Sequence, residues 1–336
     1  MVIGRFAPSP SGRMHLGNVF AALCAWLGVR SQGGRMLLRV EDLDPQRSRP
    51  EHTQALLRDL DWLGLDWDQR APDQSTRTAF YEVQLEKLQE MGLVYPCFCS
   101  RAELHSASGI VTDAANNPAN APHAGGDYVY NGRCAALSAA EQAARMAQGA
   151  AGRPSAEPAR VATQATGRAP ALRLRVPDEE VCLEDAVQGP YCENLARQCG
   201  DFIIRRSDGV FAYQLAAPCD DADQGVTQVV RGRDLLASAP RQSWLLRTLG
   251  HTPPQYAHLP LLVAPDGRRL SKRERDLDLG ALRAKGKRPE EIIGALAGLC
   301  GLADTMAPVA ARDLLLGFDF GRICKSDLII EPDILQ

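Results

Sequence analysis

Apolar and polar residues alternate along the first hundred residues in blocks that predict strands and helices in turn. Residues 2–6 (VIGRF) and 35–44 (RMLLRVEDLD) predict two strands, and further helices are expected around residues 51–63 and 76–91. Between the two strands, apolar residues recur at three- and four-residue spacing, which predicts a helix through Leu16, Val19, Phe20, Leu23, Trp26 and Leu27. This alternation predicts an α/β fold with a parallel sheet covered by helices.

The pattern changes in the middle of the chain. Residues 105–126 and 147–170 are rich in Ala, Gly and Pro, and they contain little to bury. We expect them to form surface loops of an inserted subdomain. One short helix is expected near Ser138, where Ser138 and Glu141 can form a capping box.

Strand-like patterns return in the second half. Residues 171–178 and 225–234 predict strands, and residues 201–216 predict a hairpin that turns at Ser-Asp-Gly. The tail from about residue 277 is expected to be mostly helical.

Composition and charge limit the possible classes. With 45% apolar and 24% charged residues and a net charge of −3, the chain is globular and not basic overall, so nucleic-acid contacts would come from local patches such as residues 268–275. It has neither the start of a signal peptide nor an apolar run of about 18 residues, so we expect a soluble, cytoplasmic protein. Most of the ten cysteines read as small buried hydrophobic residues and not as disulfide partners, among them Cys24, Cys182, Cys199, Cys219 and Cys300.

The turn between the first strand and the first helix is a candidate phosphate site. Residues 7–18 (APSPSGRMHLGN) place small residues and His15 where open α/β sheets bind anions with backbone N–H groups and a helix dipole. Gly12 and Gly17 allow backbone and ligand to approach closely, and His15 can donate to phosphate oxygens. A helix cap with an incidental histidine would show the same pattern.

Two motifs carry a resemblance to a known family. Residues 11–18 (SGRMHLGN) resemble the HIGH signature of the class I aminoacyl-tRNA synthetases, and residues 268–273 (RRLSKR) resemble their KMSKS loop. The glutamyl branch is indicated by RFAPSPSGRMHLGN, by LLRVEDLDPQR and by FAYQLA…DDADQGVTQVVRGRDLLASAPRQ, over roughly residues 1–100 and 172–275. Asn18 replaces the last histidine of HIGH, and the flanks of KMSKS vary at Arg269, Leu270 and Arg273.

The resemblance implies a Rossmann-like nucleotide-binding fold with an inserted zinc-binding subdomain and a short helical C-terminal subdomain. The first half of the catalytic domain, with the HIGH-like motif, is expected at residues 1–95, and the inserted subdomain at 96–171. The second half is expected at 172–250, and the KMSKS-like loop with the short helical subdomain at 251–336.

The implied reaction is activation of L-glutamate by ATP to glutamyl-adenylate, with Mg²⁺ accompanying the ATP; activation without tRNA is possible. Because the substrate carboxylate is the nucleophile, catalysis should come from alignment and from cations that stabilise phosphate charge. His15 and Lys272 are the expected catalytic residues. The ATP site is expected to comprise His15, Gly17, Asn18, Arg269, Leu270, Ser271, Lys272 and Arg273.

Charged residues near strand ends suggest the amino-acid site. Glu41 can pair with an ammonium group, and the arginine forks of Arg5 and Arg231 suit carboxylates and would penalise glutamine. Position alone would also fit ordinary ion pairs. The resemblance implies a glutamate pocket formed by Arg5, Phe6, Ala7, Pro8, Ser9, Glu41, Tyr213 and Arg231.

Cys97, Cys99 and Cys134 are candidates for a closed structural zinc site. Chemistry alone favours His123 or His105 as the fourth ligand, because imidazole binds zinc better than phenol. The sequence YNGRC resembles the family arrangement in which a tyrosine precedes the last cysteine by four residues, which implies Tyr130. Three unrelated cysteines beside a packed tyrosine remain the alternative.

The acceptor of the glutamate is suggested by length. Glutamyl-tRNA synthetases continue past the KMSKS loop with a large helical anticodon-binding region, whereas 63 residues follow Arg273 here. This resembles a shortened branch that transfers glutamate to queuosine at the wobble position of tRNA(Asp), so the expected partner is the anticodon stem-loop of that tRNA. Two alternatives stay open: a compact enzyme that charges the 3′ end of tRNA(Glu), and a non-catalytic paralogue that binds glutamate or nucleotide.

Overall fold

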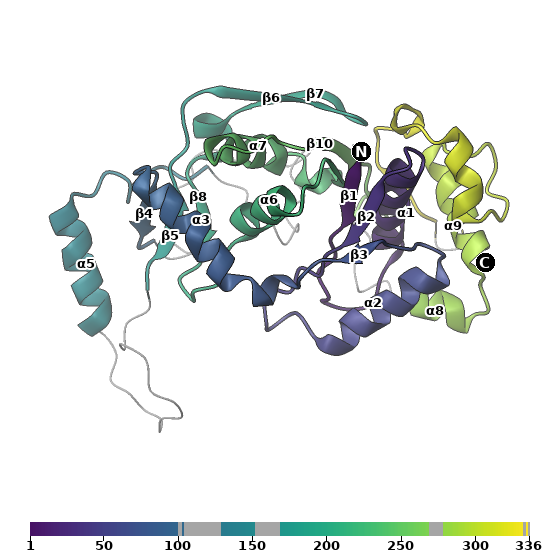
Figure 1. The fold of residues 1–336 in the computed structure, drawn as a ribbon, viewed down its shortest axis with the longest axis horizontal. Helices are drawn as coiled ribbons and strands as arrows, with labels where there is room; N and C mark the ends of the chain where they lie inside the picture. The colour runs from purple at the N-terminus through teal and green to yellow at the C-terminus, as the bar shows by residue number, and fades with distance from the viewer. Residues whose placement is uncertain (100–102, 104–128, 152–168, 269–277, 332–333, 335–336) are drawn as a thin grey trace.

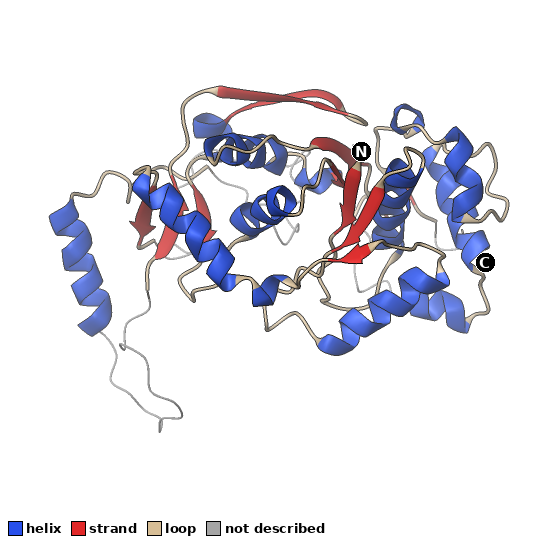
Figure 2. Ribbon diagram, viewed as in Figure 1, coloured by secondary structure: helices blue, strands red, loops and turns tan. Residues whose placement is uncertain are grey.

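The computed structural model describes residues 1–99, 103, 129–151, 169–268, 278–331 and 334. Its centre is a seven-stranded sheet, which Figure 2 shows in red beside the helices that cover it. In spatial order the strands are β3 (Gln69–Arg70), β2 (Arg35–Leu38), β1 (Ile3–Phe6), β9 (Gln228–Gly232), β10 (Gln255–Leu259), β6 (Glu180–Asp185) and β7 (Gly189–Asn194).

The sheet is parallel except for its last strand, as the alternating pattern predicts. β1 pairs with both β2 and β9, β10 pairs with β9 and β6, and only β7 runs antiparallel to its neighbour. The second strand is shorter than predicted and ends at Leu38, but the chain stays beside β1. Arg39 N donates to Phe6 O at 3.0 Å and Glu41 N donates to Pro8 O at 3.0 Å. The carboxyl ends of β1, β2 and β9 therefore meet at one edge.

Helices cover both faces of this sheet. The three predicted N-terminal helices are confirmed as α1 (Leu16–Arg30), α2 (Pro50–Trp62) and α3 (Thr78–Glu90). Figure 1 shows α1 and α9 (Pro289–Cys300) on one side of β1 and β2, and α6 (Tyr213–Asp223) and α7 (Ser238–Thr248) on the other. Because α1 lies between the sheet and C-terminal elements, it is apolar on nearly every side.

A separate antiparallel sheet carries the inserted region. It consists of β4 (Val94–Cys97), β5 (Ala171–Leu174) and β8 (Phe202–Arg205). In Figure 1, α5 (Ala139–Ala151) lies at the outer end of the molecule beyond β4. The predicted capping box is confirmed, since Ser138 N donates to Glu141 Oε2 at 2.8 Å and Glu141 N donates to Ser138 Oγ at 3.3 Å.

Of the two loops predicted in this region, the structure describes only part of the second. Residues 105–126 lie outside the described part of the chain. The first five residues of the stretch 147–170 are the end of α5 and not a loop; three of the five are alanine, the residue with the strongest helix propensity.

The prediction of a hairpin at residues 201–216 is wrong in its second arm. β8 is followed by a turn and one bridge between Arg205 and Phe211, and then α6 begins at Tyr213. Leu215 and Cys219 are four residues apart and both buried, so the apolar spacing is that of a helix.

The reading of Cys182 as a buried, unpaired residue is also wrong. Cys182 on β6 lies directly opposite Cys192 on β7, and the two form a disulfide. Both side chains are exposed because they lie on the outward face of this hairpin. The other four of those scattered cysteines are free, and Cys199 is only partly buried.

The C-terminal tail is only partly helical. It contains α8 (Leu279–Ala284), α9, two 3₁₀ turns at Ala311–Gly317 and Phe320–Arg322, and strand β12 (Leu328–Ile329), which pairs in parallel with β11 (Leu262–Val263). Among the residues that the structure describes, no helix is long and apolar enough to cross a bilayer.

Candidate active site

The start of α1 has the geometry of an anion site whose histidine is locked in one tautomer. His15 is the N-cap, its Nδ1 accepts from Gly17 N at 3.1 Å, and Asn18 Oδ1 accepts from His15 N at 3.2 Å. A Cβ at position 17 would lie 3.0 Å from the His15 ring, so a larger residue would disturb the cap. Because Nδ1 accepts, Nε2 carries the proton of the neutral ring and is the donor nitrogen.

The chain that follows the KMSKS-like motif contacts this histidine at Asp278. Arg269, Leu270, Ser271, Lys272 and Arg273 lie outside the described residues, but both flanks are described. On the far flank, Asp278 forms a bridge with His15, Leu279 N donates to Met14 O at 2.9 Å, and Arg13 Nη1 lies 3.5 Å from Asp278 Oδ1. The start of α1 therefore contacts the chain at Asp278 and Leu279, which follow the KMSKS-like motif in the sequence.

Arg5 and Glu41 belong to a buried charge cluster. Asp221 of α6 lies 3.2 Å from Arg5 Nε and 2.7 Å from Arg39 Nη1, and Arg39 Nη2 lies 3.2 Å from Glu41 Oε1. Arg39 is completely buried, and Arg5 is 3% exposed. Asp220, which is also completely buried, lies 3.8 Å from Arg39 Nε, so the buried guanidiniums are surrounded by carboxylates, as buried charges require.

The two carboxylates of this cluster are shifted in opposite directions. Burial raises the pKa of Glu41 above its ordinary value, although Arg39 and Arg5 oppose the change. Burial also acts to raise the pKa of Asp221, but the charges of Arg39 and Arg5 outweigh it and lower that pKa. Asp221 is therefore the fixed counter-ion, and Glu41 is the carboxylate that an added cation would stabilise most.

Arg231, at the end of β9, is held by four hydrogen bonds. Its Nη1 donates to Tyr213 Oη at 2.9 Å and to Gln242 Oε1 at 2.8 Å, its Nη2 donates to Leu235 O at 3.2 Å, and its Nε donates to His258 Nε2 at 2.9 Å. Burial raises the pKa of Tyr213, whose hydroxyl also interacts electrostatically with Arg231, Glu41 and Arg5. Tyr213 therefore lies between the two groups of charges.

The remaining residues predicted for the pocket follow directly after β1. Phe6 and Pro8 are buried, Ala7 is partly buried, and Ser9 is exposed. The segment turns back at Ser9, whose carbonyl accepts from Ser11 N at 2.8 Å, and it leads into the cap of α1. All the residues predicted for the glutamate pocket therefore lie around the carboxyl ends of β1, β2 and β9 or at the start of α6.

Sequence reasoning missed four buried charged or titratable residues here: Arg39, Asp185, Asp221 and His258. The sequence contains an indication for two of them. Arg39 and His258 stand within apolar strand-like runs, where a polar residue is buried and needs a partner. The partners themselves come from distant segments and left no local pattern.

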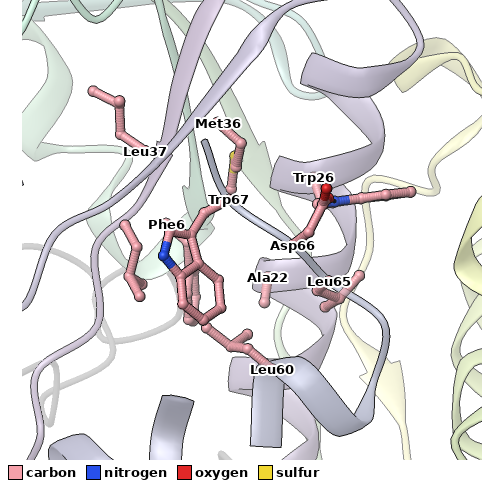
Figure 3. A pocket seen from close by; sticks show the side chains of 10 residues that line it. Phe6, Ala22, Trp26, Met36, Leu37, Leu60, Leu65, Asp66 and Trp67 are labelled. Atoms are coloured by element: carbon pink, nitrogen blue, oxygen red, sulfur yellow. Dashed lines mark hydrogen bonds between the residues drawn. The ribbon is translucent and has the colours of Figure 1, made fainter. Parts of the chain in front are cut away.

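An apolar niche lies next to this site. Figure 3 shows Phe6, Met36, Leu60 and the Trp67 indole around it, and its one charged lining residue, Asp66, accepts a 2.6 Å bond from the Trp26 indole. With so few polar groups the niche does not suit a charged substrate.

Three cysteines gather at the inserted sheet. Ligand atoms of Cys97, Cys99 and Cys134 all lie within 4.8 Å of one another. Tyr130 Oη lies 3.7 Å from Cys97 Sγ and 3.8 Å from Cys99 Sγ, and it accepts from Cys134 N at 2.9 Å. The cluster is consistent with a metal site. His105 and His123 lie outside the described residues.

The donors of the cluster fit a soft divalent cation. Burial raises the pKa of the Cys99 thiol to about 12, with Cys134 and Cys97 adding to the effect. A cation would reverse this shift by stabilising the thiolate. The Arg173 guanidinium covers the Tyr130 ring at 3.7 Å and donates to Cys97 Sγ at 3.2 Å, so it closes one side of the cluster.

Comparison with known proteins gives a consistent picture. The catalytic domain of the tRNA synthetases class I (E and Q) matches residues 1–306. Similar curated proteins include the glutamyl-Q tRNA(Asp) synthetases of Symbiobacterium thermophilum (42% identical, covering 100% of this chain and 98% of that protein) and Nitratidesulfovibrio vulgaris (41%, covering 100% and 98%). The protein of that name from Neisseria meningitidis is 43% identical over 81% of this chain and 80% of its own length.

Solved structures agree in fold. The chain resembles a glutamate tRNA ligase of Elizabethkingia meningosepticum in complex with its amino acid, with a TM-score of 0.77 and 25% identity over 99% of this chain and 68% of that one. A glutamate-tRNA synthetase of Elizabethkingia anophelis gives a TM-score of 0.78 and 25% identity over 99% and 69%.

Proposed function

The chain belongs to the class I tRNA synthetases of the E and Q type, and we propose that it activates L-glutamate with ATP and transfers it to queuosine in tRNA(Asp). One observation carries the amino-acid part: two buried arginines, Arg5 and Arg231, and one buried carboxylate, Glu41, lie around the same strand ends as the His15 cap. The acceptor rests on the curated relatives, which match at 41–43% identity.

Glutamate fits the charges of the pocket. Glu41 is the carboxylate for the substrate ammonium, and Arg5 and Arg231 supply the positive charge for its carboxylates. Tyr213, held by Arg231 at 2.9 Å, contributes a hydroxyl on the same side. Ser9 and the backbone of residues 6–8 complete the wall. Glutamine would leave a guanidinium without its anion, so the pocket favours glutamate.

ATP belongs at the start of α1. The Nε2 donor of His15 and the helix N-terminus around Gly17 and Asn18 would receive phosphate oxygens. Lys272, Arg269 and Arg273 would add cationic charge, and Leu270 and Ser271 belong to the same proposed site. The bridge between His15 and Asp278, five positions after Arg273, supports this assignment. Attack of the glutamate carboxylate on the α-phosphorus then needs alignment and charge stabilisation but no protein nucleophile. Mg²⁺ is expected to accompany the ATP.

Zinc is the metal that the cysteine cluster suits best. Three thiolates and one oxygen donor make a closed tetrahedral set, with Cys97, Cys99, Cys134 and Tyr130 as ligands. The position of the Tyr130 hydroxyl near two of the sulfurs favours it as the fourth donor. Zinc would hold β4 to the segment 130–134 and would take no part in the chemistry.

The test is transfer of labelled glutamate, with ATP, onto tRNA(Asp) with and without queuosine and onto tRNA(Glu). Label on queuosine-containing tRNA(Asp) alone is the expected result, and Lys272→Ala should abolish it. Label on tRNA(Glu) would instead identify a compact synthetase that charges a 3′ end. A folded protein that labels none of the three would favour the non-catalytic paralogue.

A further inference from the structure

A buried chain of hydrogen bonds leads away from the pocket behind Arg231. Arg231 Nε donates to His258 Nε2 at 2.9 Å, and His258 Nδ1 lies 2.6 Å from Asp185 Oδ2. The side chains of His258 and Asp185 are completely buried. Three strands supply the three residues: β9 supplies Arg231, β10 supplies His258 and β6 supplies Asp185.

The donors in this chain fix the state of the histidine. An arginine N–H can only donate, so Nε2 of His258 must be the acceptor and Nδ1 must carry the proton that Asp185 accepts. A protonated imidazole would place an N–H against the guanidinium. Burial lowers the pKa of His258 to about 4, which agrees with a neutral ring at pH 7.

Asp185 is itself held rigidly. Its Oδ1 accepts from three backbone groups, the N–H of Val187 at 3.0 Å, of Gln188 at 2.9 Å and of His258 at 3.0 Å. The Gln188 side chain adds a 2.9 Å bond to the His258 carbonyl. The β6–β7 turn and β10 therefore fix the carboxylate, which fixes the imidazole in one orientation and one tautomer.

These contacts also determine how the Arg231 guanidinium is oriented toward the proposed substrate. One N–H of Nε, two of Nη1 and one of Nη2 are used by the contacts to protein, so four of the five donors of the fork are accounted for. The guanidinium can turn only if these bonds break. Its direction toward the pocket is therefore set by the acceptors around it, of which His258 is the one that depends on a tautomer.

We propose that Asp185 and His258 are positioning residues that hold Arg231 in the orientation which selects an amino acid with a carboxylate side chain over its amide. This inference rests on the function proposed above. Neither residue touches the substrate; Asp185 sets the tautomer of His258, and His258 sets the direction of the guanidinium.

Asp185→Asn is the sharpest variant because it keeps the shape and reverses the hydrogen-bond pattern. The amide can donate to Nδ1, which moves the ring proton to Nε2 and turns it against Arg231 Nε. In glutamate-dependent pyrophosphate exchange, the KM for glutamate should rise about tenfold or more, the preference over glutamine should fall, and the KM for ATP should change less than about twofold.

A pair of substitutions at His258 supplies the rescue. His258→Gln keeps an acceptor for Arg231, and His258→Leu removes it, so the glutamine variant should retain a lower KM for glutamate. Glu193→Gln on β7 is the matched control, since it changes another buried carboxylate, 5% exposed, that accepts from Tyr191 Oη at 2.6 Å. It should leave the KM for glutamate unchanged.

The tautomer gives a readout that does not depend on turnover. In ¹⁵N-histidine spectra, His258 should carry its proton on Nδ1 in the wild type and on Nε2 in Asp185→Asn. An active wild type whose Asp185→Asn variant keeps both its KM for glutamate and its tautomer would overturn this inference alone. A wild type with no glutamate-dependent exchange would overturn the proposed function and this inference together.

Discussion

The proposed amino-acid pocket and the cysteine cluster are both largely buried groups of polar side chains, but they balance charge differently. In the pocket, Asp221 lies 2.7 Å from Arg39 and 3.2 Å from Arg5, so the cations and anions come from the chain itself. In the cluster, three sulfur atoms lie within 4.8 Å of one another beside a phenol.

The difference lies in what each group needs in order to be stable. The pocket is organised by its own salt bridges before any substrate enters, which reduces the entropy lost on binding. Thiolates at such short distances repel one another unless a cation binds them. We therefore expect damage to the pocket to alter substrate use and the free energy of unfolding, and damage to the cluster to alter metal content.

The largest effect is expected for Arg231→Ala. Loss of the guanidinium leaves a substrate carboxylate without its partner, so glutamate-dependent pyrophosphate exchange should fall at least about a thousandfold in kcat/KM, or about 4 kcal/mol. Arg233→Ala is the control, because Arg233 pairs with Asp327 and is partly exposed. A variant pair with equal activities would exclude Arg231 from the pocket.

The second effect tests whether the pocket is balanced internally. Asp221→Asn removes the carboxylate shared by Arg5 and Arg39, and an uncompensated buried charge should lower the free energy of unfolding by about 3 kcal/mol. Asp223→Asn, on the same helix, alters a carboxylate that is 44% exposed and pairs with Arg77, so it should cost less than about 1 kcal/mol. Urea unfolding measures the free energy of unfolding of both variants. Similar losses would show that burial of the carboxylate does not determine the cost of removing its charge.

The cluster is tested by Cys134→Ser. We expect about one zinc ion per purified wild-type chain and almost none in the variant, because a closed site loses its affinity with one thiolate missing. The melting temperature should fall and glutamate activation should change little. Cys324→Ser, at a partly exposed cysteine outside the cluster, should keep its zinc. Full zinc in both variants, measured by elemental analysis, would place the metal elsewhere or at other ligands.

That the residues of the proposed pocket lie together could be predicted from the sequence, because their positions follow a general rule of parallel sheets. Arg5, Glu41 and Arg231 come directly after or at the end of strand-like runs, and the ends of parallel strands meet at one edge. The strand periodicity also identified β1 and β9, whose positions determine where these side chains lie.

The partners of those residues could not be predicted for a physical reason. Asp221 is separated from Arg5 by 216 positions and Asp185 from His258 by 73, and a single contact across such a distance leaves no periodic pattern. Tyr213 was assigned to a strand because the run before it is apolar, whereas the chain turns into α6 at that residue. The cross-strand disulfide at Cys182 was missed because the β6–β7 hairpin itself was not predicted.

The smallest effect expected concerns pH and separates the two charge groups of the pocket. The folded-state pKa of His258 is about 4, below the ordinary value of 6.5, so the unfolded chain binds a proton first as pH falls. The histidine therefore contributes its full stabilisation above pH 6.5 and loses it as the pH falls toward 4.

From pH 7 to pH 5.5 the wild type should lose about 1 kcal/mol of its free energy of unfolding relative to His258→Gln, which cannot titrate there. The raised pKa of Glu41 acts in the opposite direction, but it is common to both proteins and cancels in the difference. Urea unfolding of both proteins at the two pH values measures this difference. If the difference does not change with pH, the pKa of His258 is the same in the folded and the unfolded protein, and its ring takes up a proton below pH 6.5 in spite of Arg231.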